Sequence, residues 1–246
     1  MSIEYRIGAA TDIGPRKEVN QDSYFCAADN EASAALMAVA DGVSGSLHGE
    51  IASGICTDEL SYWWSSVLPQ AGGDREKAVR TLIDAIQKAN KLVLEQQVEL
   101  RGLCATTLSV LFLLKDEWFI VHVGDSRIYR MGRGLFSAPE LMTEDDEAVV
   151  SVEEDGRNVL RKRLLHYVGE SDELTYHVKQ GKVQNGDVFM GCSDGVVKTN
   201  DDRDLKKIIR SSHTNPGALC EKLIQTALSN GETDNITAAA VFCINR

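Results

Sequence analysis

Residues 35–42 read Ala-Leu-Met-Ala-Val-Ala-Asp-Gly, an apolar run that ends in an acidic turn. The run has the length of a strand and is apolar at every position up to the aspartate. A strand with one face in water would alternate apolar and polar side chains, so this pattern predicts a strand covered on both faces. The stretch therefore indicates a layered fold, with a carboxylate at the end of a buried strand.

Similar runs of strand length recur along the chain, and most are bounded by Gly, Asp or Asn. They cover residues 3–10, 23–28, 104–114, 117–123, 126–131, 174–179, 187–192 and 236–244. Helical patterns cover 49–68, 75–100, 202–210 and 216–228, the last with Asn215 as its N-cap. Strands and helices do not alternate regularly, which disfavours a doubly wound parallel sheet. The order favours an α+β fold, with helices packed outside mostly antiparallel sheets.

The composition is that of an ordinary globular protein, with 246 residues, 43% hydrophobic and 26% charged. This length suits one large domain or at most two small ones. The net charge of −11 argues against nonspecific nucleic-acid binding, which needs a basic face. No apolar run approaches the roughly 18 residues of a membrane span, and the first residues do not resemble a signal peptide. We therefore expect a cytoplasmic protein with neither nucleic acid nor membrane as a partner.

Acidic residues stand at the ends of several predicted strands. Asp41, Asp125 and Asp194 each follow an apolar run, and Asp234 stands just before the last strand. In antiparallel neighbours the end of one strand lies beside the start of the next, so the four acids can meet at one edge of the sheets. Two carboxylates about 4 Å apart repel by roughly 4 kcal/mol at an effective dielectric constant of 20. Such a cluster therefore needs a cation.

The residue types around these acids narrow the choice of cation. The six cysteines are scattered without a C-x-x-C pair, which disfavours a zinc site or a disulfide framework. All-oxygen ligation points to Mg²⁺ or Mn²⁺, and Gly42 lets the backbone turn so that a carbonyl can also face an ion. A single Asp-Gly after a strand is usually only a turn. Spacing alone leaves the turn and the metal site both open.

The segment 142–156 differs from the rest of the chain. It is rich in Asp and Glu and shows little periodicity. Without an apolar pattern there is no buried face to define a strand or a helix. The prediction here is a surface loop or a mobile flap.

At this point the sequence resembles the metal-dependent type 2C protein phosphatases, the PPM family, and especially its bacterial members. The motifs that carry the resemblance occur in order through nearly the whole chain. They are Thr11-Asp12-Ile13-Gly14, Asn20-Gln21-Asp22-Ser23, Val39-Ala40-Asp41-Gly42-Val43-Ser44-Gly45, Ala105-Thr106-Thr107-Leu108, Val123-Gly124-Asp125-Ser126-Arg127, Cys192-Ser193-Asp194-Gly195 and Asp234-Asn235-Ile236-Thr237. Each is a weak signal alone, and together they are specific.

The resemblance implies a four-layer α-β-β-α sandwich of two mostly antiparallel sheets flanked by helices, with 1–246 as one catalytic domain. It implies a centre of two Mg²⁺ or Mn²⁺ ions between the sheets. Asp41 would bridge both ions and Gly42 would offer its carbonyl. Asp194 and Asp234 would complete the shell of one ion.

Two further acids take roles only through the resemblance. Asp22 would act through a bound water, and Asp125 with Asp194 would hold a third, weaker ion. A water bridging the two core ions would attack the phosphorus of phosphoserine or phosphothreonine directly, without a covalent phosphoenzyme. The partners would be phosphorylated proteins, a Ser/Thr kinase or its substrates among them.

The chain departs from the family pattern in three places. The family has a phosphate-gripping arginine at a fixed distance before the acid matching Asp22, and counting without gaps gives Lys17 there, with Arg16 one residue earlier. Either Arg16 is presented by a bulge, or Lys17 serves as a simpler point charge. Val43 stands where eukaryotic members carry a histidine thought to protonate the leaving alkoxide, work that falls to a metal-bound water in bacterial members. The segment 142–156 looks shorter than the usual flap.

Besides the active phosphatase, whose catalytic candidates are Asp41, Asp194, Asp234, Arg16 and Lys17, two other functions remain open. The first is a pseudophosphatase that binds phosphoproteins without cleaving them, which the unusual arginine position and the short flap favour. The second is a metal-dependent phosphoesterase that acts on small molecules. The complete set of acids favours the active protein phosphatase.

Overall fold

The buried strand predicted at 35–40 is β3 (Ala34–Ala40), and its side chains serve two separate cores. The computed structural model describes residues 3–43, 45–132, 134, 137–154, 157–212 and 214–245. Leu36 and Ala38 belong to a cluster shared with the helices, whereas Met37 and Val39 belong to a cluster between the two sheets. Both faces of β3 are thus covered, which explains its continuous apolar sequence and confirms the prediction.

Two five-stranded sheets form the centre of the molecule, and every neighbouring pair in them is antiparallel. One sheet has the order β10-β5-β4-β3-β2 and the other β1-β12-β11-β6-β7. The strands of the first are β2 (Ser23–Asp29), β3, β4 (Leu108–Leu114), β5 (Glu117–Val123) and β10 (His177–Lys182). Those of the second are β1 (Ile3–Asp12), β6 (Arg127–Met131), β7 (Glu140–Leu141), β11 (Val188–Cys192) and β12 (Ile236–Asn245).

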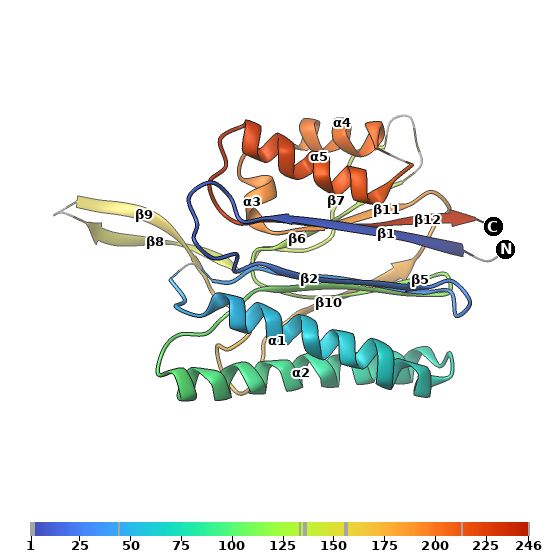
Figure 1. Cartoon of the computed structure of the whole chain (residues 1–246), viewed down its shortest axis with the longest axis horizontal. Coiled ribbons are helices and arrows are strands. Elements are labelled where there is room, and N and C mark those ends of the chain that lie inside the picture. The colour runs from blue at the N-terminus through green and yellow to red at the C-terminus, as the bar shows by residue number, and fades with distance from the viewer. Residues whose placement is uncertain are drawn as a thin grey trace.

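Helices cover the outer face of each sheet, so that the layers follow the predicted α-β-β-α order (Figure 1). The first sheet carries α1 (Gly49–Tyr62) and α2 (Arg75–Leu100), and the second carries α4 (Asp202–Ser211) and α5 (Pro216–Ser229). A four-residue helix, α3 (Asp194–Val197), follows β11. None of the helices in the described ranges is long and apolar enough to cross a membrane.

The helix predicted over 49–68 changes its geometry before it ends. After α1 come a π-helical turn, η1 (Trp63–Val67), and a 3₁₀ turn, η2 (Leu68–Ala71), which Gly72 closes in a left-handed conformation. Pro69 lacks the backbone N–H that an α-helix needs, so the chain leaves α geometry ahead of it. The other helices keep the predicted bounds to within one residue, and the Asn215 side chain caps α5 by accepting a hydrogen bond from the Ala218 N–H.

The prediction of a loop over 142–156 is wrong for most of that segment. Residues from Glu147 onward form β8 (Glu147–Glu154), which pairs with β9 (Arg157–Leu164) in a hairpin projecting from one end of the sandwich (Figure 1). The valines of β8 pair with β9, a strand that lies beyond the acidic segment and was not visible within it. Ser44, Asp155 and Gly156 lie outside the described residues.

The strand predicted at 174–179 begins three residues later, as β10. Leu174 and Tyr176 instead pack against the helix-side core, which accounts for the apolar character of the segment. The sheet pairing itself starts where His177 faces His122 across the β10–β5 ladder. Register in this strand is therefore set by its partner and not by the apolar pattern.

Candidate metal centre

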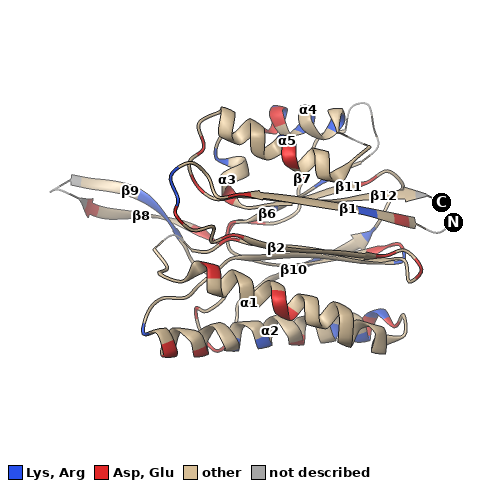
Figure 2. Cartoon of the chain, viewed as in Figure 1, with Lys and Arg blue, Asp and Glu red and all other residues tan. Residues whose placement is uncertain are grey.

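The predicted acids come together at the end of the sandwich from which the hairpin projects. Asp41 follows β3 and Asp125 follows β5, while Asp194 follows β11 and Asp234 precedes β12. Asp22 stands directly before β2, and its charge acts on Asp41 together with the charges of Asp194 and Asp125. Figure 2 shows acidic segments at these strand ends. Both sheets thus contribute carboxylates to one site.

Burial and mutual repulsion raise the pKa of several of these carboxyl groups above its ordinary value. Burial raises the pKa of Asp41 well above its usual range, and the charges of Asp22, Asp194 and Asp125 add to the rise. Burial, together with the Asp194 charge, raises the pKa of Asp22 to about 6 and that of Asp125 to about 7. Burial also raises the pKa of Asp194, although Lys198 opposes it. The cluster carries more negative charge than its surroundings compensate.

The donor atoms suit a hard divalent cation. Asp22 Oδ1 is buried and has no hydrogen-bond partner among the described residues, while Asp22 Oδ2 accepts a 2.8 Å hydrogen bond from Ser193 Oγ. The charge of Asp22 also helps to raise the pKa of Asp41, so the two carboxylates repel each other unless a cation lies between them. An unpartnered carboxylate oxygen inside an all-oxygen cluster fits Mg²⁺ or Mn²⁺.

Two lysines occupy part of this cluster. Lys17 Nζ lies 2.6 Å from Asp234 Oδ1, and Lys198 Nζ lies 2.7 Å from Asp194 Oδ2 and 3.1 Å from Asp234 Oδ2. Burial alone would raise the pKa of Asp234, but the two lysines lower it below its usual range. In this arrangement, in which lysines contact Asp194 and Asp234, the described residues hold no group of three or more His, Cys, Asp or Glu side chains already placed to bind a metal ion.

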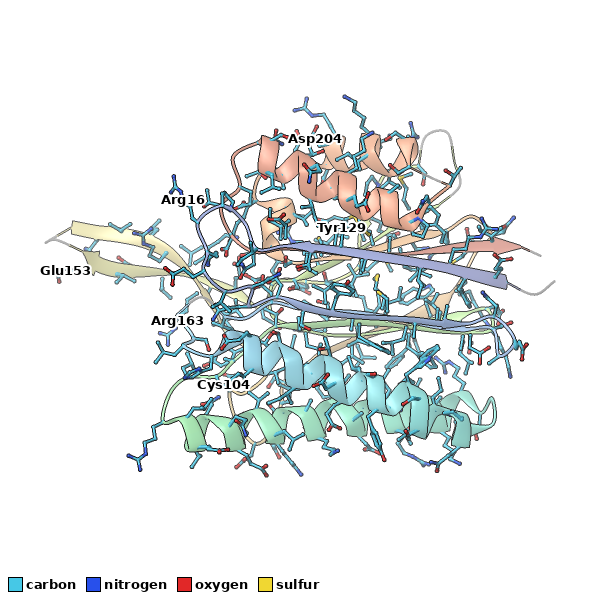
Figure 3. All side chains as sticks on the ribbon, in the orientation of Figure 1. Arg16, Cys104, Tyr129, Glu153, Arg163 and Asp204 are labelled. Atoms are coloured by element: carbon cyan, nitrogen blue, oxygen red, sulfur yellow. The ribbon has the colours of Figure 1, made fainter. Side chains whose placement is uncertain are left out.

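Of the two predicted phosphate-binding residues, the structure brings only Lys17 to the cluster. Arg16 is exposed, and its side chain extends outward from its loop (Figure 3). Lys17 is already paired with Asp234. Sequence analysis missed Lys198, whose one detectable signal was its position four residues after Asp194.

Backbone hydrogen bonds fix the turn that carries Asp41. The Asp41 N–H donates to Thr107 Oγ1 at 3.0 Å, and the Asp41 carbonyl accepts from the Thr107 N–H at 2.8 Å. A Cβ on Gly42 would lie 2.7 Å from Gln21 Cβ and 2.9 Å from Gly49 Cα, so no larger residue fits. Asp41 is thereby held at the junction of β3 with two neighbouring segments.

The root of the hairpin is tied to the turn that carries Asp125. Asp146 Oδ2 accepts a 3.0 Å hydrogen bond from the Gly124 N–H, and Asp146 Oδ1 lies 2.7 Å from His177 Nε2. Arg127 forms an ion pair with Asp145 at 2.6 Å. Sequence analysis treated Asp145 and Asp146 only as part of an acidic loop. Their side chains instead connect that segment to the candidate centre.

A cleft of about 430 Å³ lies between the acids and the hairpin root. The acids Asp41, Asp125 and Asp194 line it, together with Glu147 and the cations Lys162, Arg163 and Lys198. Lys162 is paired with Glu147 at 2.5 Å and Lys198 with Asp194. Arg163 lies at the hairpin root (Figure 3), is exposed, and forms no ion pair with any residue in the described part of the chain. It is therefore the cation available to a ligand in this cleft.

Comparison with known proteins identifies the family. The family model for protein phosphatase 2C matches residues 15–222. This chain is a member of the protein phosphatase 2C family. The resemblance inferred from the motifs is thereby confirmed.

Several named proteins are similar in sequence to this phosphatase 2C chain. It is 26% identical over 254 residues to the serine/threonine protein phosphatase PstP of Mycobacterium tuberculosis, covering 100% of this chain but 46% of that protein. It is 29% identical over 255 residues to the serine/threonine phosphatase stp of Listeria monocytogenes, covering 98% of this chain and 95% of that protein. The chain thus spans about half the length of the mycobacterial relative.

Solved structures confirm the phosphatase 2C fold. PppA, a regulatory component of the T6SS in Pseudomonas aeruginosa, superposes with a TM-score of 0.77 at 28% identity, over 99% of this chain and 100% of that one. The catalytic domain of PstP, solved in complex with two manganese ions, gives a TM-score of 0.76 at 22% identity, over 99% and 100%. The predicted layer order and the two antiparallel sheets are those of this fold.

Proposed function

We propose that this chain is a Mg²⁺- or Mn²⁺-dependent protein serine/threonine phosphatase that hydrolyses phosphoserine and phosphothreonine. The observation that carries the proposal is the convergence of five carboxylates from both sheets, among them the buried and unpartnered Oδ1 of Asp22. Membership of the protein phosphatase 2C family and the names of the relatives support it.

The ligand set follows the family resemblance. Asp41 and Gly42 would hold two core ions, Asp194 and Asp234 would complete one shell, and Asp22 would act through a water. Asp125 would join Asp194 at a third ion. When bound, the ions would activate a water for direct attack on phosphorus and neutralise charge on the phosphoryl group. Thr107 keeps Asp41 in place for that role, because it fixes the backbone on both sides of the aspartate Cα.

Substrate binding requires a cation that is free to reach the phosphate. Lys17 is engaged by Asp234 and Arg16 extends away from the loop, whereas Arg163 lines the cleft without an ion-pair partner among the residues described. A guanidinium can donate two parallel hydrogen bonds to phosphate oxygens. We propose that Arg163 orients the substrate phosphate, and the roles of Arg16 and Lys17 stay predictions, because a metal ion on Asp234 would release Lys17.

We also propose that residues 1–246 act as one catalytic domain. The substrates would be phosphorylated proteins, with a Ser/Thr kinase or its targets as partners, in the cytoplasm. Comparing kcat/KM for a phosphoprotein with that for nucleotides and sugar phosphates separates this function from a small-molecule phosphoesterase.

The decisive experiment is hydrolysis of a phosphothreonine peptide and of p-nitrophenyl phosphate with added Mn²⁺. We expect turnover that EDTA abolishes and that Asp41→Asn reduces to background. Undiminished turnover in EDTA would contradict the proposed chemistry. Binding of Mn²⁺ and phosphopeptide without hydrolysis would instead favour a phosphoprotein-binding pseudophosphatase.

A further inference from the structure

Lys198 lies between two acids of the cluster, and it belongs to none of the sequence motifs that predicted the site. It follows the short helix α3, four residues after Asp194. Its amino group contacts Asp194 Oδ2 at 2.7 Å and Asp234 Oδ2 at 3.1 Å, and so bridges two acids from different strands. One ammonium thus stands between the two carboxylates to which the family resemblance assigns one metal ion.

The environment of Lys198 favours its charged form. A lysine amine is protonated at neutral pH, and both of its contacts here are with carboxylate oxygens. Asp194 gains a partner that partly offsets the burial of its own carboxyl group. The lysine therefore neutralises these two acids without any metal.

A metal ion and Lys198 cannot share these oxygens. An ammonium left beside a divalent ion is repelled twice as strongly as it would be by a monovalent one at the same distance. The Lys198 side chain remains 43% exposed and lines the open cleft, so its flexible stem can swing out. Metal binding at Asp194 and Asp234 therefore requires the lysine to withdraw.

We propose that Lys198 is a tethered cation that holds the Asp194–Asp234 position in the metal-free protein and competes with the metal there. It lowers the metal affinity of this position and stabilises the fold when metal is absent. The inference rests on the proposed function only in assigning a metal to these two acids. Lys17, whose one ion pair among the described residues is with Asp234, competes more weakly.

The test is calorimetric titration of the chelator-treated, metal-free full chain with Mn²⁺. Lys198→Met is compared with Lys162→Met, which removes a charge from the same cleft but from a pair with Glu147, not with a proposed ligand. Both variants lose one positive charge, so the long-range attraction for Mn²⁺ changes similarly in each. We expect Lys198→Met to bind one Mn²⁺ roughly tenfold more tightly than Lys162→Met does, and Lys17→Met to fall between them.

Thermal unfolding gives a second readout that does not depend on catalysis. In EDTA, Lys198→Met should unfold several degrees below Lys162→Met, because Asp194 and Asp234 lose their shared partner. In saturating Mn²⁺ that difference should disappear. Lys198→Gln provides a second variant should the methionine prevent folding.

The outcomes separate this inference from the proposed function. Unchanged or weaker Mn²⁺ binding in Lys198→Met, with wild-type protein that binds Mn²⁺ and hydrolyses phosphopeptide, overturns the competitor role alone. Failure of every variant, wild type included, to bind Mn²⁺ overturns both. Tighter binding together with lower metal-free stability establishes the lysine as the competing cation.

Discussion

Asp146 accepts a 3.0 Å hydrogen bond from the backbone N–H of Gly124, the residue directly before Asp125. The Asp146 N–H returns a 2.8 Å hydrogen bond to the Gly124 carbonyl, and the Asp146 carbonyl accepts from the Leu165 N–H at 2.7 Å. One residue thus ties a candidate metal ligand to both roots of the hairpin. Gly124 has a φ of 106°, a conformation that glycine adopts readily and other residues rarely do.

Replacing Asp146 with alanine should destabilise the turn that carries Asp125. The buried Gly124 N–H would lose its partner, which costs about 1–3 kcal/mol, or roughly 2–10 °C in melting temperature for a chain of this size. Thermal unfolding in EDTA measures the loss. Glu153→Ala, at an exposed position toward the tip of the hairpin (Figure 3), is the control and should leave the melting temperature unchanged. Equal melting temperatures for the two variants would contradict the anchoring role.

The metal-free protein should become more stable as the pH falls from about 7 toward 5. Burial and the Asp194 charge raise the pKa of Asp125 to about 7, against 3.8 when the chain is unfolded. Between these values the folded state binds a proton that the unfolded state does not, so acidification favours folding by up to a few kcal/mol. Melting temperatures in EDTA from pH 8 to pH 5 measure the trend. Asp125→Asn should reduce the slope without abolishing it, because Asp22, with a pKa of about 6, contributes in the same direction, and an unchanged slope in this variant would assign the trend to other groups.

Arg163→Ala should lower kcat/KM for a phosphothreonine peptide by about 10- to 100-fold, because the substrate phosphate loses its orienting cation. Arg163→Lys should recover only part of the activity, since an ammonium lacks the bidentate geometry. Arg16→Ala is the matched control, because that arginine is exposed and extends outward, and it should retain full activity. A larger loss of kcat/KM in Arg16→Ala than in Arg163→Ala would instead identify Arg16 as the phosphate-binding residue.

Gly42→Ala should destabilise the fold by about 1–3 kcal/mol, since its Cβ would press against the Gln21 side chain and the Gly49 backbone. Gly54→Ala, within α1, meets nothing within 4 Å and should instead stabilise the protein by about 0.5–1 kcal/mol through helix propensity. Urea unfolding of both variants compares the two directly. An equal change in the free energy of unfolding in the two variants would show that the structure around Gly42 accommodates a Cβ without cost.

The position of four acids was predictable from the sequence because it depends on local pattern and on one rule of strand pairing. Asp41, Asp125, Asp194 and Asp234 each adjoin an apolar strand, and antiparallel neighbours bring such ends together. Asp22 follows an irregular segment with no periodicity, so its place was accessible only through the family resemblance. Strands that are apolar on both faces also predicted helices packed outside antiparallel sheets, whereas the four-layer order came only from the family resemblance.

The residues that sequence analysis missed all depend on contacts between distant segments. Lys198 was missed because its contact with Asp234 exists only in the folded protein and cannot be predicted from the spacing of the two residues in the sequence. Pairing of β8 with β9 brings Arg163 to the cleft. The strand β9 was not predicted, because its few apolar residues stand among charged ones without regular alternation. Asp146 looked like one acid among several, since its partner Gly124 lies 22 residues earlier.

The hairpin is fastened at its root and pairs only with itself, forming a two-stranded sheet within the described residues. Hydrogen bonds hold its root to the turn that carries Asp125, and its tip lies away from the acids (Figure 1). Substitutions near Glu153 (Figure 3) therefore change the surface of the hairpin tip and leave the acids beyond its root in place. The hairpin tip and the candidate centre can therefore change in sequence independently of each other.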